Sequence, residues 1–164
     1  MAYDGCLSCA RSSARSWCGK KSGDQALGRS VGGPSTKIHL ICDAHGNPLE
    51  FDLTGGQVHD VVAAPTLLEK TEEVGKYLIA DKGYDSDKFR KKTEERGSTP
   101  VIPGRKNRKE KVEYDKNIYG ARSLVENAFC SLKQLRAVAT RYDKLARNFA
   151  GMVGLACVMM WLRL

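Results

Sequence analysis

Between residues 36 and 105 the hydrophobic pattern changes repeatedly from the two-residue period of a strand to the 3.6-residue period of a helix. Two alternating stretches flank the turn sequence AHGN, which predicts an antiparallel hairpin with one buried face. A helical pattern that Asp60 is placed to cap follows, and then a short apolar run, a helix opened by a capping serine and a last brief apolar run. In chain order the stretches are 36–43, 48–54, 59–74, 76–81, 86–97 and 99–105. This ββαβαβ order predicts an α/β fold.

The rest of the chain has an irregular beginning and a helical end. Residues 5–36 are rich in Gly, Ser, Cys and basic residues and have neither hydrophobic period, which predicts loop or disorder. From about Tyr119 the spacing is helical, in two pieces that meet near Asp143. The uncharged run FAGMVGLACVMMWL has 14 residues, fewer than the roughly 20 of a spanning helix, so we expect a buried core helix and no membrane partner. A chain of 164 residues is typical of one domain.

Charge and cysteine usage indicate the partner class and the compartment. The net charge is +8, and the segment from residue 117 carries seven Lys or Arg against two acids, which favours a polyanionic partner. Six cysteines occur without a secretory signal ahead of them, so we expect free thiols in a reduced, cytoplasmic context. The sequence CLSC with Cys18 offers three thiols, whereas a structural zinc site has four closed ligands, and we expect no zinc.

One narrow stripe of the C-terminal helical stretch is polar over four turns. At 100° per residue, the side chains that share this face are Tyr119, Arg122, Glu126 and Lys133. The apolar side chains that lie roughly opposite, and are expected to pack, are Ala121, Leu124, Ala128, Leu132 and Leu135. By geometry alone the stripe is either a solvated face with an Arg122–Glu126 pair four residues apart or a functional surface.

The spacing Y-x2-R-x3-E-x6-K resembles the signature around the catalytic glutamate of bacterial insertion-sequence transposases of the DDE type. Upstream, LIADKGYDSD resembles the strand end and turn that bear the second aspartate of that family. The stretches GRSVGGPSTKIHLICDAHGNPLEFDLTGGQVHD and TRYDKLARNF resemble the branch of the IS-five kind. The resemblance covers residues 24–164 and implies an RNase H-like fold, a mixed sheet flanked by helices.

The resemblance implies three carboxylates that hold Mg²⁺, for which Mn²⁺ can substitute. It assigns the second role to Asp81 and the third to Glu126. The first role falls by position on Asp4, 21 residues before Gln25. The sequence after Asp4, GCLSCARSSARSWC, departs from the family pattern. It therefore does not support a first strand around Asp4, and it predicts a poorly ordered or divergent segment over 1–23. From the residues alone, Asp81 is also a candidate N-terminal cap of the turn that follows it.

The implied partner is double-stranded DNA, both the ends of the insertion sequence and the target. The loop GRKNRKEK has five bases in seven residues, which is typical of a solvated loop but lies between the catalytic elements. We expect contact with DNA phosphates from it and from the polar stripe. The DNA-binding candidates are Lys37, Arg105, Lys106, Arg108, Lys109, Tyr119, Arg122 and Lys133.

The resulting hypothesis is a transposase catalytic domain, a polynucleotidyl transferase and endonuclease acting at the bacterial nucleoid. It would cut phosphodiesters at element ends and join the 3′ ends to target DNA. Family members usually carry a DNA-binding domain ahead of the first aspartate, and because none is expected in residues 1–23, an upstream-encoded domain and further copies of the chain are the expected protein partners. The alternative is a truncated, catalytically inactive remnant that binds DNA.

Overall fold

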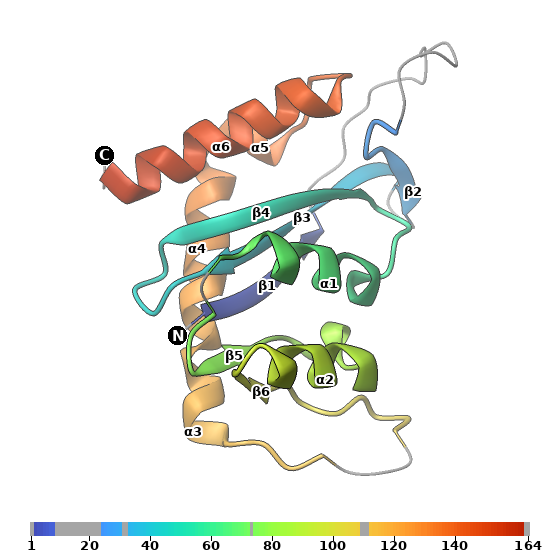
Figure 1. Ribbon diagram of the computed structural model, residues 1–164. Helices are drawn as coiled ribbons and strands as arrows, with labels where there is room; N and C mark the ends of the chain where they lie inside the picture. The colour runs from blue at the N-terminus through green and yellow to red at the C-terminus, as the bar shows by residue number, and fades with distance from the viewer. Residues whose placement is uncertain (1, 9–23, 31–32, 73, 109–111, 163–164) are drawn as a thin grey trace.

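The computed structural model describes residues 2–8, 24–30, 33–72, 74–108 and 112–162. A mixed sheet lies at its centre, with helices on both faces (Figure 1). Its strands are β1 (Ala2–Ser8), β2 (Gly28–Ser30), β3 (Gly33–Cys42), β4 (Pro48–Gly55), β5 (Tyr77–Ile79) and β6 (Thr99–Val101). The pairings give the order β4-β3-β1-β5-β6, with β2 added beside the beginning of β3. β1 runs antiparallel to β3 and parallel to β5, and β6 is parallel to β5.

The first strand, which the sequence left in doubt, is an inner strand of the sheet. Residues Tyr3–Ser8 pair with β3, and Ala2 and Tyr3 also pair with β5. The sequence AYDGCLS contains no β-branched residue, but backbone pairing with a neighbour on each side overrides this weak local preference. Residues 2–8 are thus a strand where the sequence predicted poor order, and residues 9–23 lie outside the described part of the chain.

The central part of β3 is buried on both faces, whereas the sequence predicted one buried face for the hairpin. Ile38 and Leu40 belong to the core between the sheet and the C-terminal helices, and Ile41 belongs to the core on the opposite face. His39 is fully buried with the second set. Successive side chains of a strand point to opposite faces, so His39 and Ile41 share the second face. Because His39 is polar, the sequence pattern did not indicate that this face is buried. On the edge strand β4, Leu49 is exposed, although it alternates with Phe51 and Leu53 on the face that the hairpin pattern predicted to be buried.

Two helices cover one face of the sheet, α1 (Asp60–Lys70) and α2 (Asp87–Glu95). Ser86 caps α2 as predicted, because its Oγ accepts from the Phe89 amide at 3.1 Å. α1 ends at Lys70 instead of continuing to residue 74. The Arg96 guanidinium donates to the carbonyls of Leu68, Thr71 and Glu72, so the carbonyls at the end of α1 are satisfied from another element.

The C-terminal helices cover the other face, and α4 crosses the sheet on the side opposite to α1 and α2 (Figure 1). They are α3 (Lys116–Tyr119), α4 (Ser123–Gln134), α5 (Arg136–Ala139) and α6 (Ala146–Leu162), with a 3₁₀ turn, η2 (Gly120–Arg122), before α4. The predicted break near Asp143 is confirmed, and a second break at Leu135 was not predicted. The predicted packing face of α4 contacts the core, which Val125 and Phe129 also join.

The last helix, α6, is only half buried. Phe149, Val153 and Ala156 face the core, while Leu155 and Val158 are exposed. Among the residues that the structure describes, no helix is both long and apolar enough to cross a membrane. Neither Cys130 nor Cys157 forms a disulfide bond.

Candidate functional site

Asp81 follows β5 and begins the 3₁₀ turn η1 (Lys82–Tyr84). Its Oδ1 accepts a hydrogen bond from the Lys82 amide at 2.8 Å, so the predicted role as a cap is confirmed. The side chain is nevertheless 40% exposed, and Oδ2 has no polar partner among the described residues. The cap occupies one oxygen and leaves the other able to bind a ligand.

Arg122 connects the two acids that the sequence singled out. Its Nη2 lies 2.6 Å from Glu126 Oε1, and its Nη1 lies 3.9 Å from Asp81 Oδ1. The guanidinium also lies over the Tyr119 ring, 5.7 Å from its centroid, and that ring packs edge-on against Tyr114. The predicted i,i+4 pair is therefore present, and it reaches across to the end of β5. Asp81, Glu126, Arg122 and Tyr119 form one cluster from two parts of the chain.

The electrostatics of this cluster exclude Tyr119 as a base at neutral pH. Burial raises the pKa of its phenol, and Asp81 and Glu126 add to the rise while the Arg122 charge opposes it. The carboxylates are partly exposed, and the single guanidinium between them offsets their mutual repulsion. Two carboxylates beside one cation make a place where a hard metal ion or a phosphate can bind.

The backbone of Asp4 lies on the strand next to this cluster. In the parallel ladder Tyr3 is opposite Ile79, so Asp4 is one residue and Asp81 two residues beyond that pair. This register places the backbone of Asp4, in the first half of β1, close to that of Asp81 just after β5. Within the described part of the chain, no group of three Asp, Glu, His or Cys side chains could hold a metal ion.

A cleft of about 680 Å³ adjoins Asp81, and we call it the Asp81 cleft. Its lining residues are Lys37, His59, Asp60, Asp81, Lys82, Gly83, Arg105, Lys106 and Asn107. The Lys37 ammonium donates to the Val58 carbonyl at 2.8 Å and to Asp60 at 2.9 Å, so its charge is already paired. A Cβ on Gly83 would meet the Asp60 carboxylate at 2.9 Å, so a larger residue there would require the Asp60 side chain to shift.

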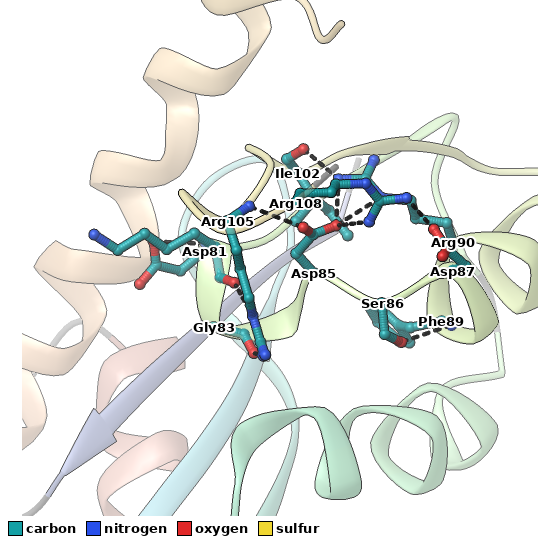
Figure 2. Close-up of polar contacts among 11 residues, drawn as sticks. Asp81, Gly83, Asp85, Ser86, Asp87, Phe89, Arg90, Ile102, Arg105 and Arg108 are labelled. Carbon is teal, nitrogen blue, oxygen red and sulfur yellow. Dashed lines mark hydrogen bonds and ion pairs between the residues drawn. The ribbon is translucent and has the colours of Figure 1, made fainter. Parts of the chain in front are cut away.

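Two arginines of the basic loop make bonds within the protein and are not available to a ligand in the cleft. Arg105 and Arg108 are bound to groups of the protein itself, in a cluster centred on Asp85 (Figure 2). Lys106 lines the cleft, whereas Lys109 lies outside the described residues. Lys133 is exposed on α4, almost two turns beyond Glu126, and does not line the cleft. The loop therefore presents fewer available charges to the cleft than the sequence predicted.

Sequence reasoning missed Asp85 and gave Asp60 the wrong role. Asp60 was expected to cap the helix that follows, but the N-cap of α1 is His59 and Asp60 is the first residue of the helix. Asp85 is buried, which opposes its ionisation, but hydrogen bonds from the Arg105 amide and from Arg90, with the charges of Arg90 and Arg108, hold its pKa below the usual range. Its partners stand up to 23 residues away, so no local spacing indicates them. For Asp60 the signal was its place in GQVHD, but its partner Lys37 is likewise distant in the sequence.

Comparison with known proteins identifies the family of this chain. Residues 12–161 match the family described as the transposase DDE domain. The chain is 36% identical to a protein of Brucella ovis named as a transposase for insertion sequence element IS6501, over 79% of this chain and 99% of the relative. It is 28% identical to a Burkholderia cepacia protein named as a transposase for insertion sequence element IS402, over 89% of this chain and 71% of the relative.

A solved structure shares the fold. The cryo-EM structure of the piggyBac transposase synaptic complex with hairpin DNA aligns with a TM-score of 0.55 and 11% identity, over 95% of this chain. The chain spans 45% of the length of that protein. The order of strands and the helices on both faces are RNase H-like, as the sequence predicted. Together with the family match over residues 12–161, this places the chain in the DDE transposase family.

Proposed function

We propose that this chain performs the DNA cleavage and strand transfer of an insertion sequence, cutting phosphodiesters at the element ends and joining the 3′ ends to target DNA. The observation that carries the proposal is the Arg122 guanidinium in contact with both Asp81 and Glu126. Double-stranded DNA is the proposed substrate, and the Asp81 cleft, with Lys106 at its rim, is the proposed place for its backbone.

The donor set fits a divalent metal ion of the kind that this family uses. Asp81 and Glu126 provide hard oxygen ligands that are partly exposed, and Asp4 stands at the adjacent position of the neighbouring strand. We assign the metal to these three residues, with Mg²⁺ preferred and Mn²⁺ as a substitute. These residues would hold Mg²⁺, and its chemistry there would be activation of the attacking water or 3′-hydroxyl and stabilisation of the leaving oxygen. Arg122 and Lys106 would hold the phosphate beside the carboxylates.

The alternative, an inactive DNA-binding remnant, is favoured by one observation. The sequence after Asp4 departs from the family pattern. Such a remnant would retain the basic surface and its salt-dependent DNA binding, but it would not nick DNA in the presence of metal. Further copies of the chain and a separately encoded DNA-binding domain are proposed partners of the active form.

Replacement of Asp81 or Glu126 tests the proposal. Asp81→Asn keeps the oxygen that accepts from Lys82, and Glu126→Gln keeps an acceptor for Arg122, so the fold is expected to survive. Each removes a ligand charge, and Mg²⁺-dependent nicking of a plasmid that bears the element ends should fall roughly a hundredfold or more. Binding to a DNA duplex, measured by fluorescence anisotropy, should persist.

The matched control is Glu94→Gln, which removes a carboxylate from the exposed surface of α2 and should leave nicking unchanged. Wild-type nicking rates in both site variants would refute the assignment of the two carboxylates. Salt-dependent binding without metal-dependent nicking by the wild-type chain would favour the remnant.

A further inference from the structure

The Asp85 carboxylate is the centre of the polar cluster beside Asp81 (Figure 2). Its side chain is only 2% exposed. Oδ1 accepts from Arg90 Nε at 3.0 Å, from Arg90 Nη2 at 2.9 Å and from Arg108 Nη1 at 2.9 Å. Oδ2 accepts from the Arg105 amide at 2.9 Å. One buried carboxylate thus receives four hydrogen bonds and joins α2 to the loop after β6.

The same cluster fixes the loop on its other side. Arg90 Nη2 also donates to the Ile102 carbonyl at 2.6 Å, where the loop begins. The Arg105 guanidinium donates to the carbonyls of Lys82 and Gly83, at 3.2 and 2.7 Å, in the turn that directly follows Asp81. The loop is therefore bound at three points, and one of them is the Asp81 turn itself.

These bonds sort the cations of the loop into two kinds. Arg108 donates to Asp85 and to Asp87, and Arg105 donates to backbone carbonyls, so both guanidinium groups serve the fold. Lys106 lies between them in the sequence, is exposed, and has no polar partner among the described residues. It lines the Asp81 cleft with Asn107. Among the described cations of the loop, the fixed framework thus leaves the Lys106 ammonium available in the cleft beside Asp81.

We propose that Lys106 is the phosphate contact of this loop and that Asp85 is the positioning residue that holds it beside Asp81. The inference rests on the proposed function, since the phosphate is that of the DNA bound in the cleft. The physical reason is preorganisation. Because the loop is fixed at three points, it loses less conformational entropy when Lys106 binds a phosphate. Arg105 and Arg108, which the sequence offered as phosphate contacts, are assigned to the framework instead.

The salt dependence of DNA binding tests Lys106 directly. Each phosphate contact contributes about 0.9 to the slope of log affinity against log salt, so Lys106→Gln should flatten the slope by about 1. Between 50 and 200 mM salt, the variant should lose roughly threefold less affinity than the wild-type chain does. The matched control is Lys88→Gln, which removes an exposed lysine of α2 outside the cleft and should leave the slope unchanged.

A double-mutant cycle tests the positioning role of Asp85. Asp85→Asn removes the negative charge that Arg90 and Arg108 share. In protein shown by circular dichroism to be folded, it should lower the affinity for DNA at least as much as Lys106→Gln does. In Asp85→Asn protein, the added Lys106→Gln change should then have almost no effect on affinity or slope. Full additivity of the two losses would overturn the positioning role. Should Asp85→Asn fail to fold, Asp87→Asn, which loosens Arg108 from an exposed partner, takes its place in the cycle.

The outcomes separate this inference from the function on which it rests. A wild-type slope in Lys106→Gln, or an equal flattening in Lys88→Gln, overturns the assignment of Lys106 while the wild-type chain still nicks DNA with Mg²⁺. A wild-type chain that neither binds duplex DNA nor nicks it overturns the proposed function and, with it, this inference. Flattening confined to Lys106→Gln supports the phosphate contact.

Discussion

Arg122 organises the candidate site because its planar guanidinium meets three groups at once. Its nitrogens lie 2.6 Å from Glu126 and 3.9 Å from Asp81, and its face lies over Tyr119. A lysine in this position would provide one point charge and no planar face, and so could not contact both carboxylates and the ring in the same way. The residue thereby holds a helix side chain close to the end of β5, where the proposed metal ligands are.

His39 is a buried histidine at the centre of the sheet, and its environment makes stability depend on pH. Nδ1 lies 2.9 Å from the Tyr84 hydroxyl and Nε2 lies 2.8 Å from Thr54 Oγ1. Burial lowers its pKa below the usual 6.5, although Asp60 and Asp52 favour the charged form. The neutral imidazole is thus the form that the folded chain retains.

We predict that acid destabilises the fold through His39. Between the lowered pKa and about 6.5, the unfolded chain binds more protons than the folded chain. The free energy of unfolding therefore has its full His39 contribution above about pH 6.5 and loses it as the pH falls toward the folded pKa, by at most about 1.4 kcal/mol per pH unit. Urea denaturation at pH 7.5, 6.5 and 5.5 measures this fall.

The variant His39→Gln should unfold more easily at pH 7.5, since it cannot keep both hydrogen bonds, and should show a smaller fall between pH 7.5 and 5.5. His45→Gln, which removes an exposed imidazole from the β3–β4 turn, should keep the wild-type fall. Equal pH dependence in the wild-type chain and His39→Gln would contradict the role given to His39.

At the scale of elements, Arg141 joins the connection between α5 and α6 to the segment before β2. Its side chain is buried and donates to Thr36 Oγ1 at 2.5 Å and to the Gln25 carbonyl at 2.9 Å. The guanidinium also lies 4.9 Å from the Phe149 ring centroid. Gln25 Oε1 in turn accepts from the Ala146 amide at 2.9 Å, at the start of α6. The segment before β2 thus satisfies the first turn of a helix more than 100 residues away.

Arg141→Lys is predicted to destabilise the chain by roughly 3 kcal/mol, because a buried ammonium cannot reproduce the divergent donors of the fork. Arg136→Lys is the matched control, since Arg136 is exposed and makes one bond, to the Tyr142 hydroxyl at 3.2 Å. Thermal unfolding followed by circular dichroism compares the two variants. A midpoint in Arg141→Lys that equals that of Arg136→Lys would show that the buried fork is dispensable.

Elements that depend on local periodicity were predictable from the sequence, and contacts between distant residues were not. α2 was located by its capping serine, and α4 by its 3.6-residue apolar period, although the period predicted one longer helix without the break at Leu135. The sequences of β1 and β2 show no strand pattern. These strands are stabilised by backbone pairing with β3, which is distant in the sequence and so could not be predicted from local periodicity. In the same way, the spacing predicted the Arg122–Glu126 pair but could not indicate that Arg122 also faces Asp81, 41 positions earlier.

At the scale of the whole molecule, β1 joins two parts of the sheet. β3 and β4 lie on one side of it, and β5 and β6 lie on the other. The Asp81 cleft has walls from both parts, since Lys37 stands on β3 and Asp81 follows β5. The pairing of β1 with both neighbours therefore holds the two walls of the cleft together, and it places Asp4 next to Asp81.

We predict that a proline in β1 disrupts the entire fold and not only its first strand. Successive amide groups of a strand point to opposite sides, so one of the adjacent residues Gly5 and Cys6 directs its N–H toward β3. Gly5→Pro or Cys6→Pro, whichever residue has its N–H toward β3, removes that donor, and we compare both with Gly5→Ala and Cys6→Ala, which keep it. Proline is tolerated in edge strands, as Pro100 is in β6, but not in inner ones. At least one proline variant should therefore lose roughly 3 kcal/mol or more of its free energy of unfolding relative to its alanine counterpart, in a single cooperative urea transition.

If both proline variants unfold at the same urea concentration as their alanine counterparts, β1 does not join the two parts of the sheet, and Asp4 has no fixed place beside Asp81.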